Sequence, residues 1–175
     1  SFYLHDSSEE SYMVIPGMDT EGYATIETHP VVQKGYWSLQ LNSIAQGKNK
    51  VDASKYMAVI DSGTSLIAGP KEIVTPLIDG IKVKQNCEGI SDLPDMTFTI
   101  DKTDYVLTYN DYVLQVTQGS QTECILGVQA LAAPEGFNYL ILGDVFMRKY
   151  PSYFNLNDNT VSFQVAKADP SFLFE

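Results

Sequence analysis

Short runs of alternating apolar and polar residues fill most of this chain, and they constrain its fold more than any other feature. Typical runs read "MTFTI" and "TVSFQVA". Turn-forming residues separate them, such as Pro16-Gly17 and the "NDN" at 157–159. Alternation with a period of two, bounded by turn residues, is typical of β-strands. We therefore predict that the chain is all-β.

Two segments depart from this pattern and are predicted to be short helices. Residues 70–80 read "PKEIVTPLIDG", with a proline near the first turn and a glycine as a stop. Pro76 should kink or shorten this helix, because proline has no backbone N–H to donate. Residues 144–150 read "DVFMRKY", and Asp144 is placed to cap their first turn. The predicted fold class is all-β with one or two short helices.

Length and charge limit the class of protein. The chain has 175 residues, 44% of them apolar, which is enough for one domain with a substantial core. Its formal net charge of -11 argues against nucleic acid or an anionic membrane as a partner. A soluble acidic surface explains this charge, and so does a protein that works at low pH, where protonation of carboxylates eases their repulsion. No apolar run is long enough to span a bilayer, and no signal peptide is recognisable.

The two cysteines, Cys87 and Cys124, leave two interpretations open. One intrachain disulfide would stabilise the fold by about 3–4 kcal/mol in the chain-entropy model. Two free, buried thiols in a cytosolic protein fit the residues equally well. The residues by themselves do not decide between them.

Few residues can support metal or nucleophile chemistry. His5 and His29 are far apart in the sequence and the cysteines form no C-x-x-C pair, so we predict no metal site and no cofactor. Both histidines are interpreted as surface or structural residues. A serine or cysteine nucleophile would need a base, and neither histidine has a convincing context for that role. The glycine-containing segments also lack the spacing of phosphate-binding loops. Carboxylate chemistry is what remains.

Asp61 has the most unusual setting of the carboxylates. The apolar run "MAVI" leads directly to it, and Ser62, Gly63 and Thr64 follow. In such a turn, backbone N–H groups and hydroxyls can bond to the carboxylate, and these bonds favour its ionised form. An ordinary Asx turn between two strands fits the same four residues, so the motif needs its context.

That context resembles the C-terminal lobe of a pepsin-like aspartic protease, of the cathepsin D and plasmepsin kind. The stretch "AVIDSGTSLIAGP" resembles the family's second catalytic loop with its following strand, and "LILGDVFMRKY" resembles the segment that threads that loop. "GYWSLQLNSI" resembles the strand before the loop, and "SFYL" the strand that starts the lobe. "NCEGISDLPDMTFTI" and "ECILGVQ" resemble the segments joined by the lobe's disulfide. These motifs occur in the family's order over nearly the whole chain.

The resemblance implies one lobe of a bilobal enzyme, formed by residues 1–175 as a closed or partly open barrel or sandwich of antiparallel strands. The N-terminal lobe is expected to lie outside this chain, which reads as a strand from its first residue, "SFYLHD". Each lobe gives one aspartate to a shared pair: one takes a proton from water while the other donates one to the substrate. The pair titrates as a unit. The isolated chain, with Asp61 alone, is therefore expected to be inactive.

The resemblance also assigns roles around the catalytic Asp61. Gly63 and Thr64 would support its carboxylate, and Ser62, where the family more often has threonine, would join a hydrogen-bond network between lobes. Hydrophobic residues would be preferred around the scissile bond, and the residues contacting substrate would be Tyr36, Val59, Thr64 and Ser65. The segment threading the loop would be Ile141, Leu142 and Gly143. Ordinary core aromatics explain Tyr36 and Trp37 equally well. The cap interpretation of Asp144 competes with a position near the pair.

The same resemblance implies partners and a compartment. Cys87 and Cys124 would form the lobe's disulfide, which implies an oxidising secretory route and a lysosomal, vacuolar or extracellular destination. The partners would be the N-terminal lobe, a polypeptide substrate and pepstatin-like inhibitors, with no nucleic acid and no membrane. A second disulfide that some members carry before the catalytic loop is absent, because "KNKVDASKYM" contains no cysteine.

Two other functions stay open. Two copies of the chain could pair their Asp61 side chains, as in retroviral relatives, although the chain is long for that design. A non-catalytic, peptide-binding or inhibitor-like lobe would keep the fold without the chemistry. The intact Asp61, Gly63 and Thr64 weigh against the last option.

Overall fold

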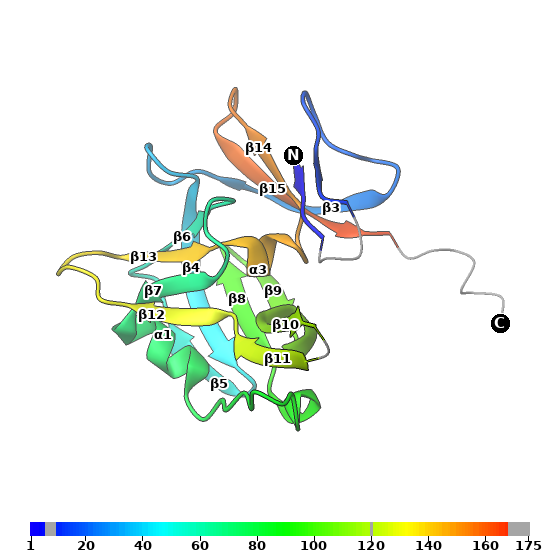
Figure 1. Cartoon of the computed structure of the whole chain (residues 1–175). Helices are drawn as coiled ribbons and strands as arrows, with labels where there is room; N and C mark the ends of the chain where they lie inside the picture. Colours follow the sequence, from blue (N-terminus) through cyan, green and yellow to red (C-terminus); the bar gives the residue numbers. More distant parts are fainter. Residues whose placement is uncertain (6–9, 120, 168–175) are drawn as a thin grey trace.

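The computed structural model describes residues 1–5, 10–119 and 121–167. They form three β-sheets. A five-stranded sheet has the order β2-β1-β14-β15-β3 and consists of β1 (Phe2–Tyr3), β2 (Tyr12–Met13), β3 (Tyr23–Pro30), β14 (Ser152–Asn155) and β15 (Thr160–Ala166). It forms the upper layer in Figure 1, above a larger sheet.

The larger, eight-stranded sheet carries most of the chain. Its order is β12-β7-β13-β6-β4-β8-β9, and β5 pairs with β4 off this path. Its strands are β4 (Ser38–Gln46), β5 (Asn49–Asp52), β6 (Met57–Ile60), β7 (Ile67–Pro70), β8 (Met96–Ile100), β9 (Thr103–Leu107), β12 (Val128–Leu131) and β13 (Tyr139–Leu142). A separate hairpin pairs β10 (Val113–Gln118) with β11 (Gln121–Leu126).

The prediction of an all-β chain is confirmed, and the sheets are open rather than closed into a barrel. Most pairings are antiparallel as expected, but β13 runs parallel to β6, and β12 runs parallel to β7. The first exception has a geometric cause. The strands β6 and β7 run in opposite directions and β13 lies between them, antiparallel to β7. A strand inserted between two opposed neighbours must be parallel to one of them.

Three short α-helices occur in the described part of the chain, one more than the upper limit predicted. Helix α1 (Lys71–Ile78) matches its prediction and ends two residues after Pro76. Helix α3 (Asp144–Met147) also matches, although it is a single turn. Helix α2 (Tyr109–Tyr112) was not predicted, yet a capping box of Thr108 and Asp111 marks its start. A 3-10 turn at Ile90–Asp92 completes the list of helical segments. These helices are far shorter than a membrane crossing requires.

The core joins the upper sheet to the larger one around an aromatic cluster. The ring of Phe146 on α3 packs edge-on against Phe98 of β8 and Phe163 of β15, with ring centroids 6.2 and 5.3 Å apart. All three side chains are fully buried. Burying a phenylalanine contributes about 1.5–3 kcal/mol, so this contact is a main reason why the two sheets stay together.

Two features of the sequence, His29 and the cysteine pair, have structural roles. His29 is buried between the sheets, with Nδ1 2.6 Å from an Asp101 carboxylate oxygen and Nε2 2.7 Å from the Tyr105 hydroxyl. Cys87 and Cys124 form a disulfide that ties the segment after α1 to β11. The disulfide implied by the family resemblance is therefore confirmed.

Candidate active site

Asp61 stands at the end of a buried strand. β6 runs between β4 and β13, and its last three residues, Ala58 to Ile60, are buried. The backbone N–H of Asp61 donates to the Leu142 carbonyl at 3.3 Å, which extends the pairing of β6 with β13 by one residue. The chain then turns, because the N–H of Thr64 donates to the Asp61 carbonyl at 3.3 Å. The Asp61 carboxylate therefore lies at the C-terminal end of an interior strand that is paired on both sides.

Two donors orient the Asp61 carboxylate. Oδ1 accepts the N–H of Gly63 at 2.9 Å, and Oδ2 accepts the Thr64 hydroxyl at 2.6 Å. A Cβ on Gly63 would lie 3.2 Å from Oδ1, tighter than ordinary contact, so glycine suits this position. The Asp61 side chain is half-buried, while Ser62 beside it is exposed. The donors leave the carboxylate accessible from one side.

The segment after β13 passes through the loop that follows Asp61. A Cβ on Gly143 would collide with the carbonyl oxygens of Thr64 and Leu66, so only glycine fits. The N–H of Asp144 donates to the Thr64 carbonyl at 2.8 Å, and the next N–H donates to the Ser65 carbonyl at 3.2 Å. The segment and the loop therefore hold each other in place.

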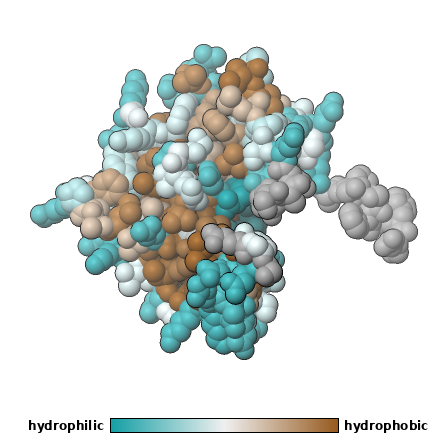
Figure 2. Space-filling model, viewed as in Figure 1, coloured by the Kyte–Doolittle hydropathy of each residue, from teal (hydrophilic) through white to brown (hydrophobic). Residues whose placement is uncertain are grey.

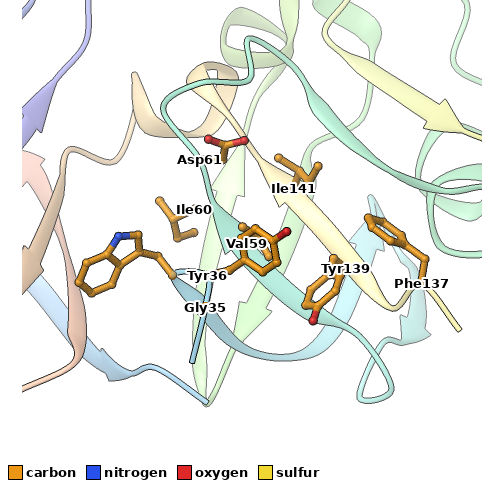
Figure 3. A pocket seen from close by; sticks show the side chains of 9 residues that line it. Gly35, Tyr36, Val59, Ile60, Asp61, Phe137, Tyr139 and Ile141 are labelled. Atoms are coloured by element: carbon orange, nitrogen blue, oxygen red, sulfur yellow. The ribbon is translucent and has the colours of Figure 1, made fainter. Parts of the chain in front are cut away.

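A pocket of about 290 Å³ opens beside Asp61 (Figure 3). Aromatic rings form its outer wall: the ring centroid of Tyr139 is 5.7 Å from that of Tyr36 and 5.3 Å from that of Phe137. The full lining consists of Gly35, Tyr36, Trp37, Val59, Ile60, Asp61, Phe137, Tyr139 and Ile141. The pocket is mainly apolar, with the carboxylate at one end, and it suits a large hydrophobic side chain.

The structure separates the predicted substrate residues into two groups. Tyr36 and Val59 line the pocket with Asp61, and Ile141 of the threading segment joins them. Thr64 and Ser65 follow Asp61 in the loop and do not line this pocket. Tyr36 is 63% exposed, so the core interpretation is wrong for it. Trp37 is partly buried and packs on Phe154 at a ring-centroid distance of 5.1 Å.

Sequence reasoning missed several lining residues, among them the aromatic Phe137 and Tyr139. Tyr139 shares a face of β13 with Ile141, while Leu140 and Leu142 are fully buried on the other face. This alternation is visible in "NYLILG" and would have placed Tyr139 once β13 was put beside Asp61. Phe137 lies in the loop before the strand, where the pattern carries no such signal.

The prediction that Asp144 caps α3 is wrong. The N-cap residue is Gly143, and no side chain bonds to the first turn. A side-chain cap is not required, because the first two N–H groups of α3 donate to Thr64 and Ser65. The Asp144 Oδ1 atom is buried and finds no hydrogen-bond partner among the described residues. Burial raises the pKa of Asp144; the Arg148 cation opposes this shift and the nearby charge of Asp61 adds to it.

Metal ligands do not gather around this site. Within the ranges that the structure describes, no three His, Cys, Asp or Glu side chains lie close enough together to hold a metal ion. The chemistry that the geometry offers is that of a carboxylate beside an apolar pocket.

Comparisons with known proteins give one consistent result. The family model for eukaryotic aspartyl proteases matches residues 1–166. Similar curated proteins include vacuolar protease A of Neurospora crassa, 35% identical over 95% of this chain and 44% of the relative. Cathepsin D of Chionodraco hamatus is 35% identical over 95% and 46%, and pepsin A of Canis lupus familiaris is 34% identical over 92% and 44%. The chain thus spans about half the length of these relatives.

Proposed function

Because this chain belongs to the eukaryotic aspartyl protease family, we propose that residues 1–175 form the C-terminal lobe of an aspartic endopeptidase. The observation that carries the proposal is the Asp61 carboxylate, fixed by the Gly63 N–H and the Thr64 hydroxyl at the mouth of an apolar pocket. The relatives are about twice as long as this chain, which leaves room for a second lobe with its own aspartate.

The reaction we propose is peptide-bond hydrolysis by water held between two carboxylates. One ionised carboxylate takes a proton from the water, whose oxygen attacks the carbonyl carbon. The protonated partner carboxyl donates its proton to the carbonyl oxygen, which gives a neutral tetrahedral intermediate. Proton transfer to the amide nitrogen then allows the C–N bond to break. Asp61 supplies one carboxylate and the N-terminal lobe the other, so the isolated chain should not turn over.

The pocket supports a preference for hydrophobic residues beside the scissile bond. Its aromatic wall of Tyr36, Phe137 and Tyr139 can bury a large apolar side chain of a polypeptide substrate or of a pepstatin-like inhibitor. The acidic composition and the paired carboxylates favour activity at acid pH. The disulfide, and a relative named as a vacuolar protease, support a secretory route with a lysosomal, vacuolar or extracellular destination.

The test is the substitution Asp61→Asn in the complete two-lobe protein, assayed on an unstructured polypeptide at acid pH. We expect activity to fall by roughly a thousandfold or more, because the pair loses one of its two proton-transfer groups. Asp52→Asn is the matched control. Its Oδ1 accepts the Ser54 N–H at 2.9 Å in a similar turn, but it does not line the pocket. That variant should keep its activity within about twofold.

Other outcomes separate the alternatives. Substantial hydrolysis by the Asp61→Asn variant would contradict the proposal. A stable dimer of the isolated chain with pepstatin-sensitive activity would favour the symmetric, single-motif enzyme. Tight peptide binding without hydrolysis, even in the two-lobe protein, would favour a non-catalytic lobe.

A further inference from the structure

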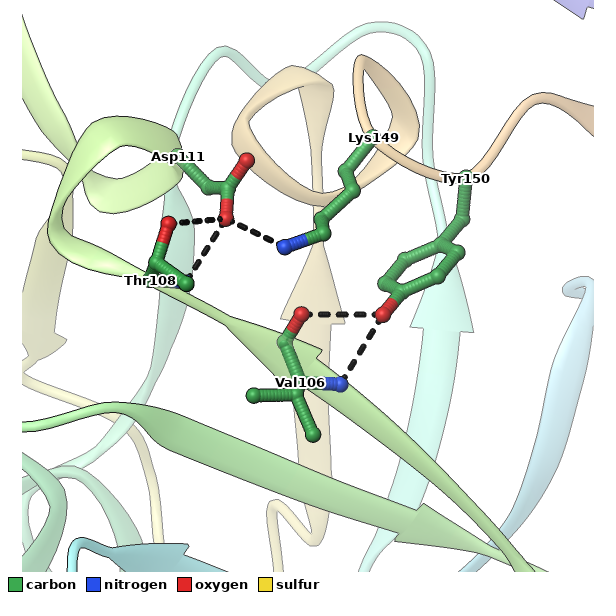
Figure 4. A network of polar contacts seen from close by, with 5 residues as sticks. All are labelled: Val106, Thr108, Asp111, Lys149 and Tyr150. Atoms are coloured by element: carbon green, nitrogen blue, oxygen red, sulfur yellow. Dashed lines mark hydrogen bonds and ion pairs between the residues drawn. The ribbon is translucent and has the colours of Figure 1, made fainter. Parts of the chain in front are cut away.

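The segment that threads the Asp61 loop is also fastened at its far end. Gly143 lies inside the loop, and seven residues later the chain reaches Tyr150 beside the last strand of the eight-stranded sheet. Figure 4 shows the contacts at this far end, where Lys149 and Tyr150 meet the β9–α2 region.

The Tyr150 hydroxyl forms hydrogen bonds with the backbone of β9. Among the residues that the structure describes, β9 is the edge strand of its sheet, and no further strand there pairs with its outward-pointing backbone groups. The hydroxyl donates to the Val106 carbonyl at 2.8 Å and accepts the Val106 N–H at 2.9 Å. Tyr150 is 7% exposed, and its ring packs against Tyr105 and Phe146 with centroids 5.1 Å away. One buried oxygen atom thus ties the segment to β9.

Lys149 adds a second tie to the neighbouring helix. Its Nζ donates to Oδ2 of Asp111 at 2.6 Å. The same oxygen accepts the Thr108 N–H at 2.6 Å, and this bond is part of the α2 capping box. It also accepts the Thr108 hydroxyl at 2.9 Å. Both charged side chains are largely shielded, with exposures of 29% and 20%. This contact is weaker than the buried one because water still reaches it.

The chain between the contacts of Gly143 and those of Tyr150 is short and mostly buried. The intervening α3 is one turn long, and Val145, Phe146 and Met147 are completely buried. At its start, the Asp144 N–H holds the Thr64 carbonyl, and the Thr64 hydroxyl holds the Asp61 carboxylate. A change in the position of α3 would therefore be transmitted to Asp61 through two hydrogen bonds.

We infer that Tyr150 is a positioning residue for Asp61, and that its hydroxyl fixes how deeply the Gly143 segment sits in the catalytic loop. Lys149 assists through Asp111. The inference deepens the proposed function and rests on it, since it gives a remote hydroxyl a role in the geometry of the proposed catalytic carboxylate.

The test compares Tyr150→Phe with Tyr112→Phe in the complete two-lobe protein. Tyr112 is fully buried as well, and its hydroxyl donates to the Pro94 carbonyl at 2.7 Å, so both variants lose one buried hydroxyl. Both should lower the Tm by a similar few degrees. Only Tyr150→Phe should lower kcat, by about tenfold, with KM unchanged within twofold. KM should hold because the aromatic wall of the pocket, Tyr36, Phe137 and Tyr139, lies outside residues 143–150; of the threading segment, only Ile141 lines the pocket.

The outcomes are distinguishable. Equal kcat values for the two variants would overturn the positioning role, because a purely structural hydroxyl would affect both in the same way. If Tyr150→Phe does not fold, Lys149→Met takes its place: a roughly threefold loss of kcat at constant KM supports the inference, and an unchanged kcat refutes it. Asp61→Asn measured alongside separates the hypotheses. If it stays active, the proposed function fails; if it is inactive while Tyr150→Phe matches Tyr112→Phe, only the positioning role fails.

Discussion

Two turns in this chain hold an aspartate in nearly the same way, yet only one has the geometry of a site. In both, Oδ1 accepts the N–H of the residue two positions later at 2.9 Å: Ser54 for Asp52 and Gly63 for Asp61. Asp52 is exposed, whereas Asp61 is half-buried beside an aromatic pocket with a second segment threaded through its loop. The Oδ1 bond is shared, so much of the difference comes from the residues around the turn, several of which lie about 80 positions away in the sequence.

Gly143→Ala should have the largest effect, because it attacks that distant contribution. The added methyl group would meet the Thr64 and Leu66 carbonyls, which are backbone and cannot rotate away. We expect a loss of about 4 kcal/mol or more in the free energy of unfolding, measured by urea denaturation. Gly22→Ala is the control in a third aspartate turn, where the new Cβ meets only an ordinary 3.5 Å contact with Asp19. Similar stabilities for the two variants would contradict the threading argument.

Thr64→Val should come second, because it removes the hydroxyl that donates to Asp61 within its own turn. The Oδ2 of Asp61 loses its 2.6 Å bond while the volume of the side chain is nearly kept. We expect kcat of the two-lobe enzyme to fall by about 10²-fold, in line with the loss of one oriented donor at a reacting group. Thr64→Ser restores a hydroxyl and should recover most of the rate. If valine performs as well as serine, the hydroxyl does not orient the carboxylate.

Tyr139→Ala removes part of the aromatic pocket wall beside Asp61, a pocket that Asp52 does not line. Two ring contacts disappear, with Tyr36 and with Phe137, and the pocket loses apolar surface. We expect kcat/KM for substrates with a large hydrophobic residue beside the scissile bond to fall by about 10- to 100-fold, with less change for small residues. Tyr153→Ala, on the five-stranded sheet and outside the pocket lining, is the control. Equal losses for large and small substrates would argue against a specificity role.

Asp144→Asn should produce a smaller effect that depends on pH. Burial raises the pKa of Asp144 above its usual 3.8, so the folded state binds its proton more tightly than the unfolded chain does. The wild-type carboxyl therefore costs stability as pH rises above about 4. The difference in Tm, variant minus wild type, should grow by a few degrees between pH 3 and pH 7, as followed by thermal unfolding. A constant difference would show that the folded state does not bind the Asp144 proton more tightly than the unfolded chain does.

Asp52→Asn should have the smallest effect, with the opposite sign. The Ser54 N–H lowers the pKa of Asp52 below 3.8, so its stabilising contribution exists at neutral pH and is lost as pH falls through that lower value. The side chain is fully exposed, and water screens the interaction. We expect a Tm loss of no more than about two degrees at pH 7 that vanishes near pH 2. A larger loss would mean that the two turns are less alike than their distances indicate.

The sequence predicted what is local in this fold. The strand ending at Asp61 and the helix at Lys71–Ile78 follow from alternation, proline and glycine placement. The insertion of β13 between β6 and β7 could not be predicted from periodicity, because strand order is set by contacts between distant residues. The family resemblance indicated only that a segment ending at Gly143 threads the Asp61 loop. Phe137 and Tyr139 were missed for the same reason.

The errors have the same physical origin. Asp144 has the residue type of a helix cap, but the donors of α3 were already used by Thr64 and Ser65, a fact that no local pattern contains. Helix α2 was missed although the Thr108 and Asp111 capping box was visible, because a four-residue helix offers no periodicity. Local patterns alone did not predict the site residues that come from distant segments; Tyr36 and Ile141 were predicted only through the family resemblance.

The place of β13 between β6 and β7 also has a consequence for the order of folding. The last hydrogen bond of the Asp61 strand runs to Leu142, so the Asp61 loop cannot reach its final form until that part of the chain has been synthesised and inserted. Closing a contact over some 80 residues is slow compared with forming the β8–β9 hairpin. In a refolding experiment with pulsed hydrogen exchange, we expect the Asp61 amide to gain protection after the hairpin amides. A ribosome-bound chain would then carry an unassembled Asp61 turn until β13 has emerged.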